Sequence, residues 1–301
     1  MTGAGSAEVA ARLEDGYLTP DTEGEWFQPG KDISVGDLSI DNQLTRNRDP
    51  DDATPDGSRE GNFVGTASVS FTMTDDKWHD LLPFENGSLS QQGGLAPSAE
   101  WYFGVQALDD DLAEINESIT AAGASVINAE VQYQEGQDVS VDLTIEFGDL
   151  SDSAPAAGEI VQPSSEDVYT HHGTDLSVGG VDQSAMQSAT LSLANLARRQ
   201  EQQARTPRAM VVGAIEPELT TDAIFSGPDQ LELAVGGTTN SVGDMIEGEE
   251  TGSLTFENGL GETIEYTLSK LQPIDYSFTA LVEPDTDLTE PVTYHVANVE
   301  V

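Results

Sequence analysis

The segment FVGTASVSFTMT, residues Phe63–Thr74, alternates between apolar or small side chains and polar ones. The apolar set begins at Phe63, continues through Val69 and Phe71, and ends at Met73. A period of two residues places alternate side chains on opposite faces of a β-strand. The segment therefore predicts a strand with one buried face and one solvated face.

The segment VINAEVQYQEGQDVSVDLTIEFGDL, residues Val126–Leu150, shows the same alternation on both sides of a polar turn. Residues Ile127–Tyr133 form the first run, Gln134–Asp138 the turn and Val139–Phe147 the second run. Two alternating runs joined by a Gly-containing turn predict a β-hairpin. Further alternating runs lie at Ala189–Leu193, Ile264–Leu268, Tyr276–Ala280 and Val292–Val296. We therefore expect a mainly β chain.

One segment shows helical spacing instead. In Asp109–Ala122, the apolar residues Leu112, Ile115 and Ile119 follow an acidic first turn, and Gly123 comes directly after. Acidic residues suit the N-terminal end of a helix, and glycine suits its C-terminal end. This segment predicts one short helix.

The chain of 301 residues exceeds the usual size of a single domain. Residues 151–180 are rich in Ser, Pro, Gly and Asp and lack sustained periodicity. Such a composition is typical of a linker or an extended arm. We therefore expect a first β domain at residues 1–150, a linker or arm at 151–180 and a second β domain at 181–301.

The chain is strongly acidic, with 55 Asp and Glu residues against 11 Lys and Arg, a formal net charge of -44. Lys31, Lys77 and Lys270 are its only lysines. Self-repulsion of this size disfavours a compact state unless salt screens it, so we expect a protein of a halophile. In molar salt the Debye length is about 3 Å, so partners must be held by contact and burial. An acidic surface also repels phosphates, which argues against specific nucleic-acid binding.

The sequence shows neither a secretion signal nor a membrane-spanning segment. The N-terminal segment MTGAGSAEVAARLEDG lacks the basic start and apolar core of a secretion signal. No apolar run approaches the roughly 20 residues that span a bilayer. We expect neither secretion nor membrane insertion.

An internal repeat emerges when Leu38–Ile40 is set over Leu191–Leu193. Matching residues then follow in the same order. The further matches are Arg46 with Arg199, Thr54-Pro55 with the nearby Thr206-Pro207, and Val64-Gly65 with Val212-Gly213. The differences in length fall in polar loops, as in a duplicated domain that has drifted. The alternative is chance similarity between two short β segments.

All arginines except Arg12 lie in the two loops between the matched segments. Guanidinium groups make bidentate contacts with carboxylates, so these residues are candidates for contacts between subunits or rings. Alternatively, they offset carboxylates of their own loop, such as Asp49, Asp51 and Asp52. The candidates are Arg46, Arg48, Arg59, Arg198, Arg199, Arg205 and Arg208. The first loop, Thr45–Asn62, is polar and long, which predicts an arm that becomes ordered on assembly.

Catalytic and cofactor chemistry finds little support in the sequence. There is no cysteine, and the four histidines have no convincing nucleophile beside them, so we expect no enzyme. His171 and His172 are adjacent, and adjacent side chains on a strand point to opposite faces, which disfavours a metal site. No phosphate-binding glycine loop is present, so we expect no cofactor. Trp26, Trp78 and Trp101 are expected to fill a core or a subunit seam.

The run SIDNQLTRNRDPDDATPDGSREGNFVGTASVSFTMTDDKWHDLLPF, residues Ser39–Phe84, resembles the front half of a major tail tube protein of tailed, siphovirus-like viruses. In that family a strand, a long polar stacking loop, a second strand and a short helix precede a hairpin like Val126–Leu150. The resemblance covers Asp32–Leu150 well and Thr174–Val301 less closely. Together with the acidity, it implies a virus of a haloarchaeal host.

The resemblance implies two tandem tail-tube-like β-sandwich or barrel domains with short helices and long polar loops, and residues 45–62 as the stacking loop. Such proteins self-assemble into stacked rings that form the virion's tail tube, a channel for genome ejection. Common family members have one domain and form hexamers. A duplicated chain would form a homotrimeric pseudo-hexamer, or a homohexamer with its second domain outside.

The partners implied are further copies of the chain and the tape-measure, tail terminator and tail tip or baseplate proteins. Viral DNA would pass through the lumen without specific binding, and the chain would be made in the host cytoplasm before it joins the virion. The alternative function is a secreted or surface-exposed β-sandwich binding or adhesion protein of a halophile. That function would require a secretion signal.

Overall fold

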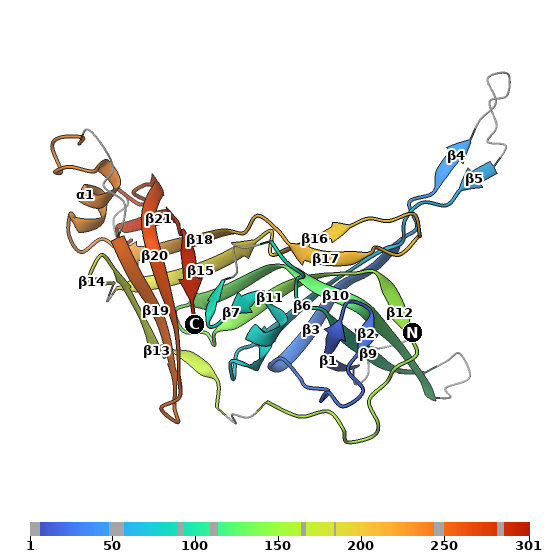
Figure 1. The fold of residues 1–301 in the computed structure, drawn as a ribbon. Coiled ribbons are helices and arrows are strands. Elements are labelled where there is room, and N and C mark those ends of the chain that lie inside the picture. The colour runs from blue at the N-terminus through green and yellow to red at the C-terminus, as the bar shows by residue number, and fades with distance from the viewer. Residues whose placement is uncertain are drawn as a thin grey trace.

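A computed structural model describes residues 7–47, 57–89, 93–108, 114–163, 167–183, 185–243, 250–281 and 286–301. Antiparallel strands make up most of these residues, so the predicted mainly β class is confirmed (Figure 1). No helix in this part of the chain is long and apolar enough to cross a membrane.

The elements before residue 160 are β1 (Ala7–Gly16), β2 (Thr19–Pro20), β3 (Lys31–Asp41), β4 (Thr45–Asn47), β5 (Gly57–Arg59), β6 (Val64–Thr72), the 3-10 helix η1 (Lys77–Leu81), β7 (Phe84–Glu85), β8 (Ser88–Leu89), β9 (Ala99–Leu108), β10 (Glu114–Gln134), β11 (Ser140–Phe147) and β12 (Asp149–Ser151). The later elements are β13 (Tyr169–Val178), β14 (Val181–Asp182), β15 (Met186–Ala194), β16 (Ala197–Gln200), β17 (Ala209–Val212), β18 (Glu216–Ile224), α1 (Asp229–Val235), β19 (Glu250–Asn258), β20 (Thr263–Tyr276), β21 (Thr289–His295) and β22 (Asn298–Glu300). The predicted strand at Phe63–Thr74 and the predicted hairpin at Val126–Leu150 are confirmed as β6 and as the paired β10 and β11.

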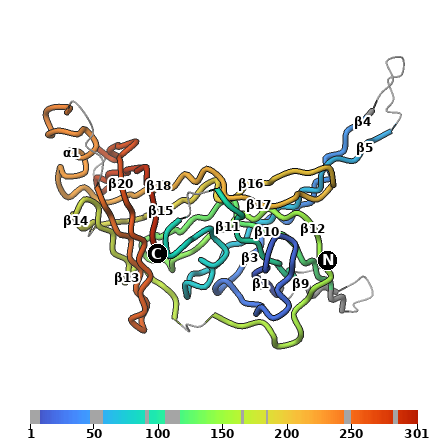
Figure 2. Tube along the Cα trace, viewed as in Figure 1, coloured from blue at the N-terminus to red at the C-terminus, as the bar shows by residue number. Residues whose placement is uncertain are grey.

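A continuous antiparallel sheet runs across the molecule in the order β3–β6–β11–β10–β15–β18–β21–β20. Figure 2 shows β20 and β3 on different sides of β15. Strands β10 and β15 lie on either side of the segment 151–180, and Val131 of β10 stands opposite Leu191 of β15. We call this β10–β15 pairing the internal seam. It joins the two halves of the chain by backbone hydrogen bonds.

Two smaller sheets flank the central one. The first has the order β1–β9–β10–β12, and the second has the order β13–β19–β20–β22. Each uses the first part of a long strand, β10 or β20, whose later part belongs to the central sheet. Apolar side chains between the sheets form the core, which includes Trp26, Trp78 and Trp101, as expected.

The same order of strands and pairings occurs twice. β1, β3, β6, β9, β10, β11 and β12 have the counterparts β13, β15, β18, β19, β20, β21 and β22. The register repeats as well. A row across the first half contains Leu38, Ala67, Ile145 and Val126, and its counterpart contains Leu191, Leu219, Tyr294 and Pro273.

This register tests the sequence alignment residue by residue. It matches Leu38–Ile40 with Leu191–Leu193, as the sequence predicted. The predicted match of Val64-Gly65 with Val212-Gly213 is wrong. Gly65 stands opposite Ile40 in β6, and its counterpart is Pro217, which stands opposite Leu193 in β18. Val212 instead ends the hairpin that precedes β18.

The predicted helix at Asp109–Ala122 is also wrong. Residues 109–113 lie outside the described part, and the remainder belongs to β10. From Glu114 to Ala121, β10 pairs residue by residue with β9. This ladder satisfies the backbone groups of both strands, and tertiary pairing of this kind overrides a weak local preference for helix.

The segment 151–180, which was expected to be a linker or arm, contains a strand. β13 lies within it and pairs with β19 from Tyr169 to Val178. Leu176 and Val178 of β13 are buried. Two alternating apolar residues in a Ser- and Gly-rich context are too short a pattern to predict a strand.

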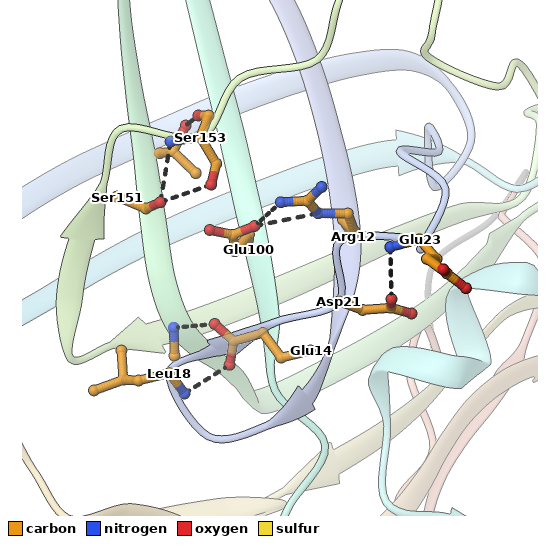
Figure 3. Close-up of polar contacts among 10 residues, drawn as sticks. Arg12, Glu14, Leu18, Asp21, Glu23, Glu100, Ser151 and Ser153 are labelled. Carbon is orange, nitrogen blue, oxygen red and sulfur yellow. Dashed lines mark hydrogen bonds and ion pairs between the residues drawn. The ribbon is translucent and has the colours of Figure 1, made fainter.

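A carboxylate supports the point where β10 passes between sheets. Gly123 has φ 60°, and its counterpart Lys270 in β20 has φ 54°. The side chain of Glu14 accepts a hydrogen bond from the Gly123 N–H at 2.9 Å. It accepts another from the Leu18 N–H at 3.0 Å (Figure 3). It also accepts one from the Ser98 hydroxyl at 2.6 Å. Burial raises the pKa of Glu14 despite these hydrogen bonds.

Substitution of Gly123 tests this crossing. A Cβ at Gly123 would lie 2.8 Å from Leu18 Cδ2, at a φ that disfavours alanine. We expect Gly123→Ala to lower the free energy of unfolding by about 3 kcal/mol through strain and overpacking. Gly136 has φ 79° but nothing within 4 Å of an added Cβ, so Gly136→Ala should cost only about 1 kcal/mol. Denaturant unfolding in molar salt would measure both values, and equal losses would contradict a steric role for Gly123.

Candidate assembly surfaces

Two hairpin arms leave the central sheet, and Met210 and Val212 of the second arm pack against Ala96 and Ile127 of the first half. The first arm is β4–β5, inserted between β3 and β6, and the second is β16–β17, inserted at the counterpart position between β15 and β18. Both arms extend to the same side, and the second reaches the base of the first (Figure 1). Residues 48–56 of the first arm lie outside the described part.

Two of the candidate arginines hold the arms together within one chain. Arg199 Nη2 donates to the Phe63 carbonyl oxygen at 2.6 Å, and Arg199 Nε lies 3.2 Å from Glu146 Oε1. Arg205 Nη2 donates to Asn42 Oδ1 at 2.7 Å, while the Phe63 N–H donates to the Arg205 carbonyl oxygen at 2.8 Å. The second arm is therefore fastened to the base of the first.

The other candidate arginines are placed differently. Arg46, Arg59, Arg198 and Arg208 are exposed, and the described residues give them no ion pair. Arg48 lies outside the described part. Contacts of these side chains with another subunit remain a prediction.

Arg199 occupies a largely buried position beside Glu146. Burial raises the pKa of the Glu146 carboxyl, and the Arg199 guanidinium opposes this shift. The sequence could not pair these two residues, because Glu146 is one of many carboxylates and lies in a distant hairpin. Removing the guanidinium would leave a buried carboxylate without its cation.

We expect Arg199→Ala to lower the free energy of unfolding by about 3 kcal/mol, because it leaves Glu146 and the Phe63 carbonyl without their partner. Arg198→Ala, at the neighbouring exposed position, should change it by less than about 0.5 kcal/mol. Adding Glu146→Gln to Arg199→Ala should recover part of the loss. Denaturant unfolding in molar salt would measure all three variants. Similar losses for the two arginines would show that the buried contact does not stabilise the arm.

The central sheet ends in two edges that lack a partner among the described residues. Strand β3 pairs only with β6, and the segment Gln272–Tyr276 of β20 pairs only with β21. These two edges are the counterparts of the strands that meet at the internal seam, since β3 corresponds to β15 and β20 to β10. The chain therefore carries, at its outer edges, the two components of a pairing that it already makes internally.

Side-chain exposure follows the same logic. Ile40 on β3 is 42% exposed, whereas its counterpart Leu193 at the internal seam is 1% exposed. Leu38 is half-buried, whereas its counterpart Leu191 is fully buried. The face near the β3 edge is thus as apolar as the buried face at the internal seam, but it is exposed in the single chain.

Arg12, the arginine outside the arms, serves the interior. Arg12 of β1 faces Glu100 of β9 and forms a buried ion pair with it (Figure 3). The Arg12 guanidinium also lies 4.6 Å from the centre of the Trp26 ring. Figure 3 further shows Ser153 donating its N–H to Ser151 Oγ, which shapes the chain after β12.

The adjacent histidines of β13, His171 and His172, pack against each other. Within the described part of the chain, no group of three or more His, Cys, Asp or Glu residues could hold a metal ion. His171 and His172 do not point to opposite faces, because their ring centres lie 3.7 Å apart. The irregular pairing of β13 and β19 between Tyr169 and Thr174 breaks the alternation there.

His79 joins the two halves of the chain. It lies in η1, is buried, and its Nε2 is 2.8 Å from the hydroxyl of Tyr266 in β20. Burial lowers the pKa of His79 to about 3. The ring is therefore neutral wherever the protein is folded at ordinary pH.

This burial predicts a pH dependence of stability. An unfolded histidine takes up a proton near pH 6.5, whereas folded His79 does so near pH 3, so acid favours the unfolded chain. The contribution of the neutral ring is complete above about pH 6.5 and is lost as the pH falls toward 3. When the pH falls from 7 to 5, the free energy of unfolding should decrease in both proteins. We expect the decrease to be roughly 2 kcal/mol smaller for His79→Gln than for the parent chain. Buried carboxylates such as Glu14 act in both proteins, so parallel pH profiles would contradict this prediction.

Comparison with models of protein families and with curated proteins finds no match for this sequence.

Proposed function

We propose that this chain is a structural protein, not an enzyme, and that it assembles with copies of itself into closed, stacked rings. We further propose that these rings form the tail tube of a haloarchaeal tailed virus, as the resemblance of Ser39–Phe84 and Val126–Leu150 implies. The observation that carries the proposal is the complementarity of the two outer sheet edges. An unpaired, partly apolar edge is a liability unless a partner covers it.

The internal seam defines how two chains would join. At that seam Ala129, Glu130 and Val131 stand opposite Leu193, Ser192 and Leu191. The counterpart residues are Tyr276, Ser277 and Phe278 in and just after β20, and Ile40, Ser39 and Leu38 in β3. Tyr276 of one chain would therefore stand opposite Ile40 of the next, Ser277 opposite Ser39, and Phe278 opposite Leu38.

Repetition of this pairing around an axis leaves no edge exposed and closes the sheet into a ring. Since each chain contributes two similar halves, three chains would give a pseudo-hexamer. The arms project to one side of the sheet, where Arg46, Arg59 and Arg198 are exposed and could reach carboxylates of the next ring. An acidic lumen would let viral DNA pass without specific binding. The tape-measure, terminator and tip or baseplate proteins would bind the ends of the tube.

The primary experiment is negative-stain microscopy of the purified chain in molar salt, with mass measurement of any small ring. Tubes with a central channel and three chains per ring are expected. Six chains per ring would be consistent with a tube but would contradict the trimeric pseudo-hexamer. A persistent monomer would contradict self-assembly and favour a binding or adhesion protein.

A single substitution at the β3 edge tests the joint. Ile40→Asp places a carboxylate in the pairing with the next chain, where its burial would be costly. Because Ile40 is exposed in the single chain, we expect a folded variant that fails to form rings. Val181→Asp, at an exposed site in β14, should assemble normally. Rings formed equally well by both variants would rule out pairing through β3.

A further inference from the structure

A narrow apolar groove lies beside the inner face of the β3 edge. It has a volume of about 210 Å³ and runs between β3 and the flanking sheet of the first half. Its apolar lining residues are Val9, Val35, Leu38, Phe103 and Ile119. Glu8 and Glu117 also line it, and both are exposed. Ile119 is 38% exposed, which is unusual for an apolar side chain on a face that otherwise belongs to the core.

The second half of the chain has a corresponding surface, and other residues of the same chain cover it. The strand registers assign Leu176, Leu254, Tyr266 and Leu191 as counterparts of Val9, Phe103, Ile119 and Leu38. All four counterparts are completely buried. Val9 and Phe103 are buried as well, so the two surfaces differ at Ile119 and at the half-buried Leu38.

The filling segment comes from the other half of the chain. His79 of η1 makes the 2.8 Å hydrogen bond to Tyr266, and the two rings pack edge to face with centres 5.6 Å apart. Thus η1 of the first half crosses the internal seam and covers the flanking sheet of the second half. The seam is therefore built from a strand pairing and from this inserted segment together.

The counterpart of η1 is α1. η1 begins at Lys77 after β6 ends at Thr72, and α1 begins at Asp229 after β18 ends at Ile224, so each follows its strand at the same spacing. Gln230 of α1 is buried and accepts a hydrogen bond from the Tyr294 hydroxyl, which fixes the helix over β21. Leu231 then takes the place that His79 has in η1, and it is only half-buried.

From these equivalences we propose that the groove at Ile119 is the docking site for α1 of a second copy of this chain, with Leu231 of that copy packed against Ile119. The inference rests on the ring assembly proposed above and extends it, because it adds a side-chain lock to the backbone pairing. The groove is continuous with the β3 edge, as the Tyr266 surface is with the internal seam. One neighbouring copy would therefore occupy both.

The charges of the two surfaces predict how this contact responds to salt. Glu8 and Glu117 border the groove, and Asp229 and Glu232 lie on α1. These carboxylates repel one another at low ionic strength, and only apolar burial holds the contact together. The lock should therefore form in molar salt and open when the salt is diluted.

Cross-linking tests the proposal, because the chain has no native cysteine. The double variant Ile119→Cys with Leu231→Cys, assembled in molar salt and treated with a short bis-maleimide, should give covalent oligomers of the chain that diminish at low salt. The control pairs Leu231→Cys with Leu260→Cys, since Leu260 is an exposed apolar residue in the β19–β20 turn, outside the groove. It should yield at most one-tenth as much cross-linked product.

A second variant guards against a misfolded double mutant. Ile119→Glu places a third carboxylate in the groove without disturbing a buried residue, so it should remain folded and raise the salt concentration needed for assembly. Leu260→Glu should leave that concentration unchanged. Rings without cross-links, and with unchanged salt dependence for Ile119→Glu, would overturn the docking of α1 and leave ring formation intact. A parent chain that stays monomeric by mass would overturn the ring and the docking together.

Discussion

The fold depends on strand β10, which belongs to two different sheets. Its first part belongs to a flanking sheet with β9 and β12, and its later part lies in the central sheet between β11 and β15. A backbone that serves two sheets must turn between them, and Gly123 provides this turn with a positive φ. Glu14 binds the N–H of Gly123 and so secures the point from which both sheets extend. The internal seam, and with it the contact between the halves, follows from this crossing.

The repeated strand order relates an open surface of the first half to a covered surface of the second half. In a repeated fold, each unit buries part of its apolar face against the next unit, and a terminal unit leaves that face open. The second half receives β10 and η1 of the first half, so Leu193 and Tyr266 are buried. No described segment covers the corresponding surface of the first half, where Ile40 and Ile119 are exposed. In the ring assembly proposed above, a neighbouring copy would supply this cover.

Two of the few basic residues make specific contacts with buried groups, and they contribute little to balancing the net charge. Arg12 is buried against Glu100, and Arg199 is held between Glu146 and the Phe63 carbonyl. Each provides a planar group with several donors in a place where a carboxylate or carbonyl would otherwise lack a partner. The net charge of -44 is therefore screened by ions of the solvent and not balanced by basic side chains. Contacts between acidic surfaces then depend on apolar burial, which salt does not screen.

The sequence by itself determined the mainly β class, strand β6, the β10–β11 hairpin and the core of the repeat at Leu38–Ile40 and Leu191–Leu193. These features depend on local alternation, which is visible in a single strand. Only the tertiary structure decided that residues 114–122 and 169–178 are strands, because their conformation comes from pairing with β9 and β19. It also decided which arginines are engaged and where the open edges and groove lie. Those features depend on which distant segments meet, and no local pattern encodes that.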